Sequence, residues 1–289
     1  MNGFLILDKP QGVSSANCVY KLRSMLGIKR IGHCGTLDPL ATGLLPICIG
    51  EATKFSNYAS DLDKVYEVGI KFGIETDTGD ITGKIVSERK FTGFKKNLDQ
   101  SLTNLEGYQN QVPPMYSAIK IKGKPLYYWA RKGVSLYREP RQIEIKSIEL
   151  IHQSGFSAVL KVFCSKGTYI RSLVEVLGRD LGCLATMTSL RRLKVGEMEL
   201  DQASCSFDDT QNSINNKLLP CDAMLSEFDK IALNLEDAKK VRNGLSIDYN
   251  AQLKNKGLVR IYTETELFIG IGEVNDNKKL LPKRLLSTN

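Results

Sequence analysis

One stretch of the chain brings together residue types that can do nucleophilic or acid–base chemistry. Residues 32–46, GHCGTLDPLATGLLP, hold His33 and Asp38 among three glycines and two prolines. Glycine permits backbone conformations with positive φ, whereas proline fixes φ and removes a donor, so the run predicts a shaped loop. Asp38 precedes Pro39, which disfavours a helical backbone at Asp38. We therefore expect a carboxylate at a fixed loop position, five residues after one of only two histidines.

The local pattern also allows simpler interpretations of these two residues. An aspartate before proline is common in turns, where its carboxylate accepts hydrogen bonds from nearby backbone N–H groups. A single histidine is more often structural than functional. The stretch has neither the spacing of a phosphate loop nor the glycine pattern of a dinucleotide site. A phosphoaspartate enzyme built on Asp38 would need metal-binding carboxylates close by, and residues 30–48 contain no other acidic side chain.

The composition favours a globular protein with a polyanionic partner. The chain has 289 residues, of which 42% are hydrophobic, enough for one large domain and a small one, or for two domains. Its formal net charge is +8, and a basic excess attracts nucleic acid without sequence specificity. A basic enzyme with another kind of substrate would share this charge, so the charge alone does not define the partner.

Cysteine and histidine usage predicts neither a metal site nor a disulfide framework. The 7 cysteines occur without a C-x-x-C pair, and the two histidines, His33 and His152, lie far apart. Free thiols fit a reducing compartment, and the N-terminus lacks the features of a signal peptide. No apolar run approaches the roughly 18 residues that a membrane span needs. We expect a cytoplasmic protein with no metal.

Periodicity and caps predict the elements that precede and follow the loop. Residues 4–7 are an apolar run typical of a strand, and Ser14 or Ser15 can cap a helix that ends at Gly27. Residues 44–49 are expected to form the strand that leaves the loop. These elements would hold the loop from both sides.

An alternating strand follows, after a helix that we expect over residues 50–60. Residues 64–72 alternate between apolar and polar side chains, as a half-buried strand does. One face of this strand carries Tyr66, Val68, Ile70 and Phe72. Tyr66 is therefore either a core aromatic or the wall of a site at the strand's end, and periodicity alone favours the core.

The second half of the chain predicts two further strands and a helix. Residues 142–151 and 156–164 alternate, and residues 165–171 turn the second strand into a helix that ends near Gly178 or Gly182. A basic, aromatic segment comes before them, at about residues 105–140. Interleaved basic and aromatic residues are typical of a surface that contacts RNA, although an ordinary solvated hairpin has the same composition.

The composition shifts after about residue 211. Residues 211–216 read as a polar loop, and a small helix is expected from about Ile231. Short strands are predicted over residues 258–262 and 267–271. This pattern indicates a small, separate C-terminal unit.

The motif residues resemble one known family. GHCGTLDPLATGLLP resembles the signature loop G-H-x-G-x-L-D-P-x-A-x-G of the TruB family of tRNA pseudouridine synthases. The stretches FLILDKPQGVSS, GEATK, SKGTYIR and LRRL resemble further family motifs in the same order, and together they cover most of residues 1 to about 225. The resemblance implies an α+β fold, in which helices surround a mixed, mainly antiparallel sheet. It also implies a small C-terminal PUA-like β-rich domain.

The resemblance assigns three catalytic roles. Asp38 matches the family's catalytic aspartate, and Tyr66 matches its active-site tyrosine, in a stacking or general-base role. Arg171 matches an arginine whose ion pair orients the aspartate, a task that suits a permanently charged guanidinium able to grip a carboxylate through two nitrogens.

The resemblance also assigns binding roles around the pocket. Tyr169 and Leu190 match residues that line the uracil pocket, together with Tyr66. His33 is expected to fill or support the space that the base leaves when it is flipped out of the RNA. Lys9 matches a segment packed beneath the active-site loop, which indicates a structural role.

The implied reaction is the isomerisation of uridine to pseudouridine in the T-loop of tRNA, at position 55. It needs no redox change and no group donor, so we expect no cofactor. Asp38, ionised at neutral pH if its pKa is near the usual 3.9, could add to the sugar or to the uracil ring, or a glycal could form. The alternative is a tRNA-binding folding chaperone with little or no catalysis.

The implied organisation is a catalytic domain over residues 1–225, with an RNA-clamping arm at about 105–140, and a C-terminal RNA-binding domain over 226–289. The expected partner is the T-arm stem-loop of tRNA. We expect no membrane association, no obligate protein partner and a monomer.

Overall fold

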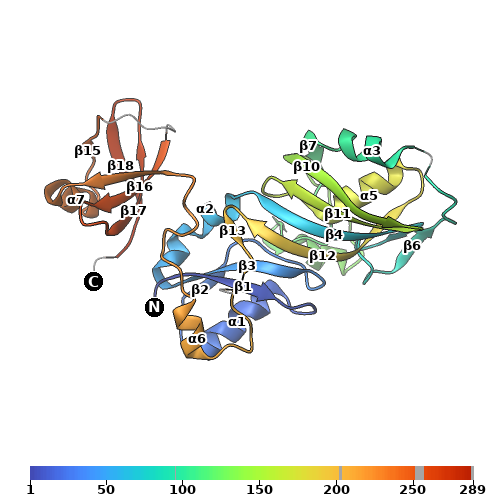
Figure 1. The fold of residues 1–289 in the computed structure, drawn as a ribbon, viewed down its shortest axis with the longest axis horizontal. Coiled ribbons are helices and arrows are strands. Elements are labelled where there is room, and N and C mark those ends of the chain that lie inside the picture. The colour runs from blue at the N-terminus through green and yellow to red at the C-terminus, as the bar shows by residue number, and fades with distance from the viewer. Residues whose placement is uncertain (95, 202–203, 251–256, 288–289) are drawn as a thin grey trace.

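The computed structural model of the protein describes residues 1–94, 96–201, 204–250 and 257–287. A large sheet with helices around it occupies most of the molecule, and a smaller sheet formed by the C-terminal residues lies at one end (Figure 1). This arrangement confirms the predicted α+β class, with a C-terminal β-rich unit.

The large sheet contains nine strands within the described residues and is mainly antiparallel. Among the described strands of this sheet, the one parallel pairing joins β12 to β3. Along the sheet the strands run in the order β1 (Gly3–Lys9), β3 (Thr42–Ile49), β12 (Ala185–Val195), β4 (Lys64–Phe72), β11 (Ser157–Cys164), β10 (Arg141–Ser154) and β7 (Gly107–Gln111). Two short strands flank this path: β2 (Ile31–His33) beside β3, and β13 (Met198–Glu199) beside β12.

Strand β4 lies in the middle of this sheet, between β12 and β11. Its bounds match the predicted strand, and Tyr66, Val68, Ile70 and Phe72 are all buried, as the alternation predicts. The predicted strands over residues 142–151 and 156–164 are confirmed as parts of β10 and β11, and residues 44–49 as part of β3.

The first helix, α1 (Ser15–Leu26), confirms the predicted caps. The Ser14 side chain accepts a hydrogen bond from the Asn17 N–H at 3.2 Å, and Gly27 ends the helix with φ of 67°. Val19, Leu22 and Leu26 fall on its buried face. This helix therefore packs beneath the loop that carries Asp38, where the Ser15 hydroxyl bonds both the N–H and the C=O of Leu37.

Other short elements complete the large domain. The helix expected over residues 50–60 consists of a 3₁₀ helix, η1 (Gly50–Phe55), followed by α2 (Ser56–Asp61). The remaining elements are β5 (Ile74–Thr76), β6 (Ile85–Glu88), α3 (Leu98–Asn104), β8 (Lys120–Ile121), β9 (Lys124–Pro125), α4 (Leu126–Ala130) and α5 (Ile170–Asp180). Strands β8 and β9 form a small hairpin whose turn contains Gly123 with φ of 75°.

The segment predicted as a polar loop at residues 211–216 is a helix, so that prediction was wrong. Helix α6 (Gln211–Asn216) begins after Thr210, whose hydroxyl accepts a hydrogen bond from the Ser213 N–H at 3.2 Å. Its single buried residue, Ile214, anchors it to the core. A cap and one apolar contact outweigh the low helix propensity of a segment rich in asparagine and serine.

The C-terminal sheet has five strands in the described part of the chain, in the order β14 (Asp229–Leu233), β16 (Gly257–Thr263), β17 (Phe268–Val274), β18 (Lys279–Leu285) and β15 (Ile247–Asp248). The helix expected from Ile231 starts later: Ile231 belongs to β14, and α7 (Leu235–Arg242) begins after its cap, Asn234. The strands predicted at residues 258–262 and 267–271 lie within β16 and β17, apart from Leu267.

Apolar contacts join the C-terminal unit to η1 and α2 of the large domain. The rings of Phe55 and Phe268 lie 5.5 Å apart between centroids, and those of Tyr58 and Phe228 lie 5.7 Å apart. Lys54 adds a hydrogen bond from its Nζ to the Leu285 carbonyl at 2.8 Å. The C-terminal domain is therefore packed against η1 and α2 rather than merely tethered. Among the described helices, none is both long and apolar enough to cross a membrane.

Candidate active site

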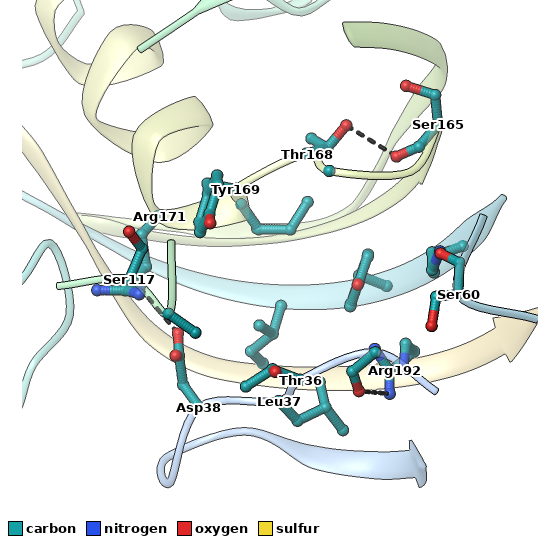
Figure 2. Close-up of a pocket in the computed structure, with 17 residues that line it drawn as sticks. Thr36, Leu37, Asp38, Ser60, Ser117, Ser165, Thr168, Tyr169, Arg171 and Arg192 are labelled. Atoms are coloured by element: carbon teal, nitrogen blue, oxygen red, sulfur yellow. Dashed lines mark hydrogen bonds and ion pairs between the residues drawn. The ribbon is translucent and has the colours of Figure 1, made fainter. Parts of the chain in front are cut away.

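A cavity of about 260 Å³ opens where the loop after β2 meets β4, β12 and the start of α5 (Figure 2). This volume is slightly below the usual range for small-ligand sites, which starts at about 300 Å³. Five of the residues assigned from the sequence line it: Asp38, Tyr66, Tyr169, Arg171 and Leu190. Segments far apart in the chain thus converge on one cavity.

Asp38 and Arg171 form an ion pair at one side of this cavity, with 2.9 Å between Oδ2 and Nε (Figure 2). The Arg171 side chain is only 5% exposed, whereas that of Asp38 is 33% exposed. The terminal nitrogens of Arg171 donate to the Thr78 carbonyl at 2.8 Å and to the Tyr116 carbonyl at 2.7 Å. Arg171 therefore joins three segments through one nitrogen each, instead of gripping the carboxylate with two.

Burial raises the pKa of the Asp38 carboxyl above its ordinary value of 3.8, and the positive charge of Arg171 opposes this shift. The negative charge of Asp80 adds to the rise. A carboxylate that is less well solvated than in water is a stronger base and nucleophile. Asp38 is therefore held by an ion pair in a partly desolvated environment.

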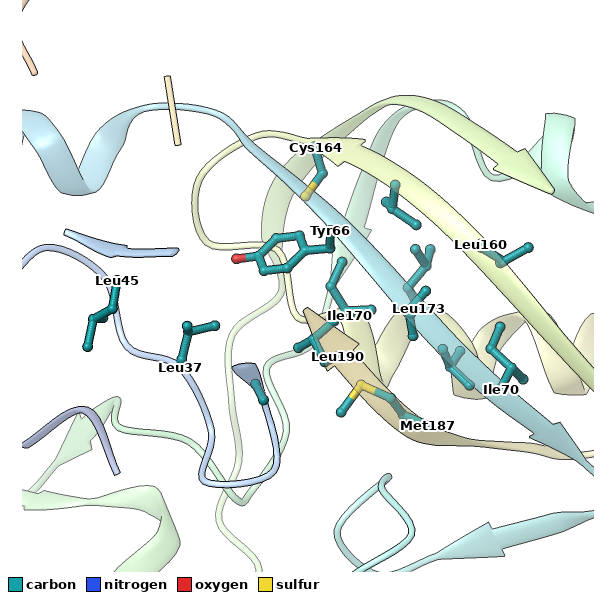
Figure 3. Packing of buried hydrophobic residues seen from close by; sticks show 14 of the residues in the cluster. Leu37, Leu45, Tyr66, Ile70, Leu160, Cys164, Ile170, Leu173, Met187 and Leu190 are labelled. Carbon is teal, nitrogen blue, oxygen red and sulfur yellow. The ribbon is translucent and has the colours of Figure 1, made fainter. Parts of the chain in front are cut away.

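Tyr66 belongs both to the hydrophobic core and to the cavity wall. Its ring lies among buried side chains that include Ile170 and Leu190 (Figure 3), and the same residue lines the cavity. Burial raises the pKa of the Tyr66 hydroxyl, and the positive charge of Arg192 opposes the rise. A raised pKa disfavours the phenolate, which favours the stacking role over the general-base role.

The structure places two cations in the cavity that the sequence interpretation did not select. Lys64 is 5% exposed, and its Nζ donates to the Ser60 carbonyl at 2.7 Å and to the Leu62 carbonyl. Arg192 is 1% exposed. The sequence alone could have pointed to Lys64. It shares the inward face of β4 with Tyr66, and a charged residue at an inward strand position is unusual.

The signature loop itself positions Arg192. The Arg192 Nε donates to the Leu44 carbonyl at 2.6 Å, and a terminal nitrogen donates to the Gly35 carbonyl at 3.2 Å. Gly43 has φ of 96°, and a Cβ there would lie 2.3 Å from the Arg192 carbonyl oxygen. Glycine at this position therefore allows β3 and β12 to approach closely enough to hold Arg192 against the loop.

The structure does not bring His33 into the lining of the cavity. His33 ends β2, and its Nδ1 is buried without a hydrogen-bond partner among the described residues. Burial lowers the pKa of its imidazole. Lys9 is fully buried, and its Nζ donates to the carbonyls of Val13 at 2.6 Å and Pro10 at 2.9 Å, as a structural residue would.

Tyr169 is held at the junction of β11 and α5. Its N–H donates to the Gln111 side-chain oxygen at 2.7 Å, and its carbonyl accepts from the Gln111 amide nitrogen at 3.0 Å. These two bonds fix the backbone between the cavity and β7. The described residues contain no group of three His, Cys, Asp or Glu side chains that could hold a metal ion.

Chains of two solved structures have a similar fold. The chain is similar to a protein in the structure of an H/ACA RNP bound to a substrate RNA containing 2′-deoxyuridine, with a TM-score of 0.76 over 99% of this chain and 85% of that one, at 20% identity. A Cbf5-Nop10-Gar1 complex gives a TM-score of 0.75 at 23% identity, over 99% of this chain and 84% of that one. Similarity at this level of identity concerns the fold alone.

Sequence comparison defines the family. Residues 23–170 match the model of the TruB family pseudouridylate synthase N-terminal domain, residues 171–226 match the tRNA pseudouridylate synthase B C-terminal domain, and residues 230–286 match the C-terminal model of pseudouridine synthase II TruB. The chain is 41% identical to tRNA pseudouridine synthase B of Chromobacterium violaceum, over 99% of this chain and 95% of that protein. It is also 41% identical to the same enzyme of Pseudomonas aeruginosa strain UCBPP-PA14, over 99% and 96%.

The chain therefore belongs to the TruB family. It is a tRNA pseudouridine synthase, an enzyme that isomerises uridine in tRNA.

Proposed function

We propose that the protein isomerises the uridine at position 55, in the T-loop of tRNA, and that Asp38 is the nucleophile. The observation that carries the proposal is the ion pair of Asp38 and Arg171 in a cavity that Tyr66 and Leu190 also line. A uridine in a folded T-loop must be flipped out of its stack to enter such a cavity. The ring can then stack on Tyr66 while the sugar faces Asp38.

Asp38 begins the reaction by attacking the nucleotide as the glycosidic N–C bond breaks. Arg171 keeps the carboxylate in place, since its own position is set by the carbonyls of Thr78 and Tyr116. Tyr169 and Leu190 complete the uracil pocket. His33, outside the cavity lining, supports the RNA where the base has left its stack.

The domain roles follow from the same proposal. Residues 1–225 form the catalytic domain, the segment at about 105–140 clamps the T-arm, and residues 226–289 form a PUA-like RNA-binding domain. The base of the arm reaches the site directly, since Ser117 and Ala118 line the cavity. We propose a monomer without an obligate protein partner, in the cytoplasm, where all seven cysteines stay free thiols.

Mapping pseudouridine in RNA treated with the purified protein tests this proposal. The substrates are a complete tRNA transcript and an isolated T-arm stem-loop, each with a matched version that carries cytidine at position 55. We expect pseudouridine at position 55 in both uridine RNAs and nowhere in the cytidine controls. Modification at another position would refute the T-loop assignment, and tRNA folding without any modification would favour the chaperone.

A further inference from the structure

The charges that line the cavity are unbalanced. Three basic side chains and one acidic side chain line it: Lys64, Arg171, Arg192 and Asp38. Arg171 is paired with Asp38, so two positive charges remain. Burying a cation without a partner charge costs several kcal/mol after relaxation. A site that keeps two such cations is therefore expected to use them to bind or stabilise an anion.

Neighbouring carboxylates do not supply that partner charge. The carboxylates that precede Lys64 most closely, Asp61 and Asp63, pair instead with Lys166, at 2.7 Å, and with Lys146. Across the described segments, neither Lys64 nor Arg192 has an ion pair within 4.0 Å. Both cations instead bond backbone carbonyls, which hold them in place without neutralising them.

The strand register places both cations beside the aromatic wall of the pocket. Arg192 on β12 lies directly opposite Tyr66 on β4, and Leu190 precedes Arg192 by two residues on the same face. Lys64 lies two residues from Tyr66, also on one face of β4. In Figure 2, Arg192 lies well away from the pair of Asp38 and Arg171. A uracil ring against Tyr66 would therefore have the sugar end at Asp38 and the cations at its far edge.

We propose that Lys64 and Arg192 stabilise the detached uracil ring as an anion. This inference rests on the proposed function. When the N1–C1′ bond breaks, both bonding electrons leave with the ring, and the negative charge spreads from N1 to O2 and O4. Preorganised cations facing the atoms where charge develops lower the barrier to such a step, because they need no reorganisation during the reaction.

The same charges are consistent with the complete isomerisation. After cleavage, C1′ is bonded to an Asp38 oxygen, or C2′ has lost a proton to form a glycal. The ring turns, and its C5 forms the new bond to C1′ as the Asp38 oxygen leaves C1′ or, from the glycal, as C2′ regains its proton. The C5 proton then leaves and N1 gains a proton, so the product is an isomer of the substrate and Asp38 is regenerated. A free anion can turn while its charge remains delocalised over O2 and O4, within reach of a cationic wall.

A backbone phosphate is the other anion that RNA offers. The depth of the two cations argues against it, since Lys64 is 5% and Arg192 is 1% exposed, whereas phosphates of a bound stem-loop stay near the surface. Lys166, with a side chain that is 57% exposed, is better placed for a phosphate. Burial lowers the pKa of Lys64 to about 8, and the positive charge of Arg192 lowers it further, against the opposing effect of Cys164, Asp61 and Asp63. This pKa is still above neutral pH, so the ammonium form of Lys64 persists there.

The test compares uridine with 5-fluorouridine at the target position of the T-arm stem-loop. Fluorine withdraws electrons, so it stabilises the ring anion without help from the protein. Single-turnover consumption of the target nucleoside is measured by digestion and mass spectrometry. For Lys64→Met we expect a loss of about 10²-fold with uridine, the usual cost of removing one charge-stabilising group, and a several-fold smaller loss with 5-fluorouridine.

Three further variants separate charge from structure. Lys64→Gln is neutral but keeps N–H donors for the Ser60 and Leu62 carbonyls, so it should fold even if Lys64→Met does not. Like Lys64→Met, it should lose less of its rate with 5-fluorouridine than with uridine. Lys64→Arg keeps the charge and should retain most of the uridine rate. The control Lys166→Met should leave the ratio of the two rates unchanged.

Equal losses on both RNAs in Lys64→Met and Lys64→Gln would overturn the inference and indicate a structural role. Weaker RNA binding with an unchanged single-turnover rate would overturn it in favour of a phosphate contact. A wild-type protein that forms no pseudouridine in the uridine RNA would instead refute the proposed function, so the two failures are distinguishable.

Discussion

Replacing Asp38 with asparagine tests the catalytic site most directly. The two side chains have nearly the same size, and asparagine is itself a good turn former, so the loop before Pro39 should persist. The change removes the negative charge, and an amide is a poor nucleophile. We expect pseudouridine formation to fall by about 10³-fold or more, which corresponds to about 4 kcal/mol in the activation barrier.

The expected effect on stability is smaller than the effect on the barrier, because two contributions oppose each other. The contact of Asp38 with Arg171, at 2.9 Å, is a charged interaction that usually contributes about 1.5–3 kcal/mol. The raised pKa of Asp38 means that the folded protein favours a neutral side chain at this position, and asparagine is neutral. Arg171 also keeps its bonds to Thr78 and Tyr116. Because the Arg171 guanidinium, 5% exposed, then lies buried without its carboxylate partner, the free energy of unfolding should fall by about 1–3 kcal/mol, which is less than the change in the activation barrier.

A single preparation of the variant supplies all three measurements: pseudouridine yield, tRNA affinity and thermal unfolding. The matched control is Asp8→Asn, which breaks the ion pair of Asp8 with Arg191, at 2.8 Å, outside the lining of the cavity. The control should keep its activity with a change in stability of about 1 kcal/mol or less, since both side chains of its ion pair are partly exposed. A near-normal yield for Asp38→Asn would refute the catalytic role, as would a loss of activity that merely follows unfolding.

Three other outcomes are expected. The affinity for tRNA should fall steeply between low and moderate salt, because phosphate contacts release counterions; a constant affinity in filter binding would contradict this. Arg171→Met should lower the free energy of unfolding by about 3 kcal/mol, since it leaves buried partners without a bond; an unchanged urea midpoint would contradict it. The catalytic rate should fall toward acid with a midpoint above 3.8, because Asp38 acts ionised and its pKa is raised; a midpoint at or below 3.8 in a pH–rate profile would contradict it.

Local signals in the sequence were enough to predict the elements that frame the site. Alternation defined β4 to the residue, and Ser14 and Gly27 defined the ends of α1. Such signals depend on neighbours in the chain, so they can be read without the fold. The helix at 211–216 was missed because its cap, Thr210, lies in a polar segment whose composition favours a loop.

The positions and partners of the charged side chains in the site could not be predicted from such local signals. Arg171 was expected to grip Asp38 with two nitrogens, but carbonyls of two distant segments take its terminal nitrogens, and no local pattern encodes those partners. The burial of Arg192 depends on the pairing of β12 with β3 and β4, which sequence periodicity does not specify. Tyr66 could be read as core or as site, and the structure shows both, because the cavity opens at the end of the core.

The position of β12 bears on how the enzyme is made. Strands β1, β3 and β4 come from the first 72 residues, yet β3 and β4 are joined through β12, which begins at Ala185. A chain emerging from the ribosome therefore carries Asp38 long before the strand with Leu190 and Arg192 exists to close the cavity. Pairing between strands far apart in the sequence forms slowly, so the pocket forms only after β12 has paired with β3 and β4. We consequently expect an unfinished chain to be inactive on RNA, although it already contains Asp38.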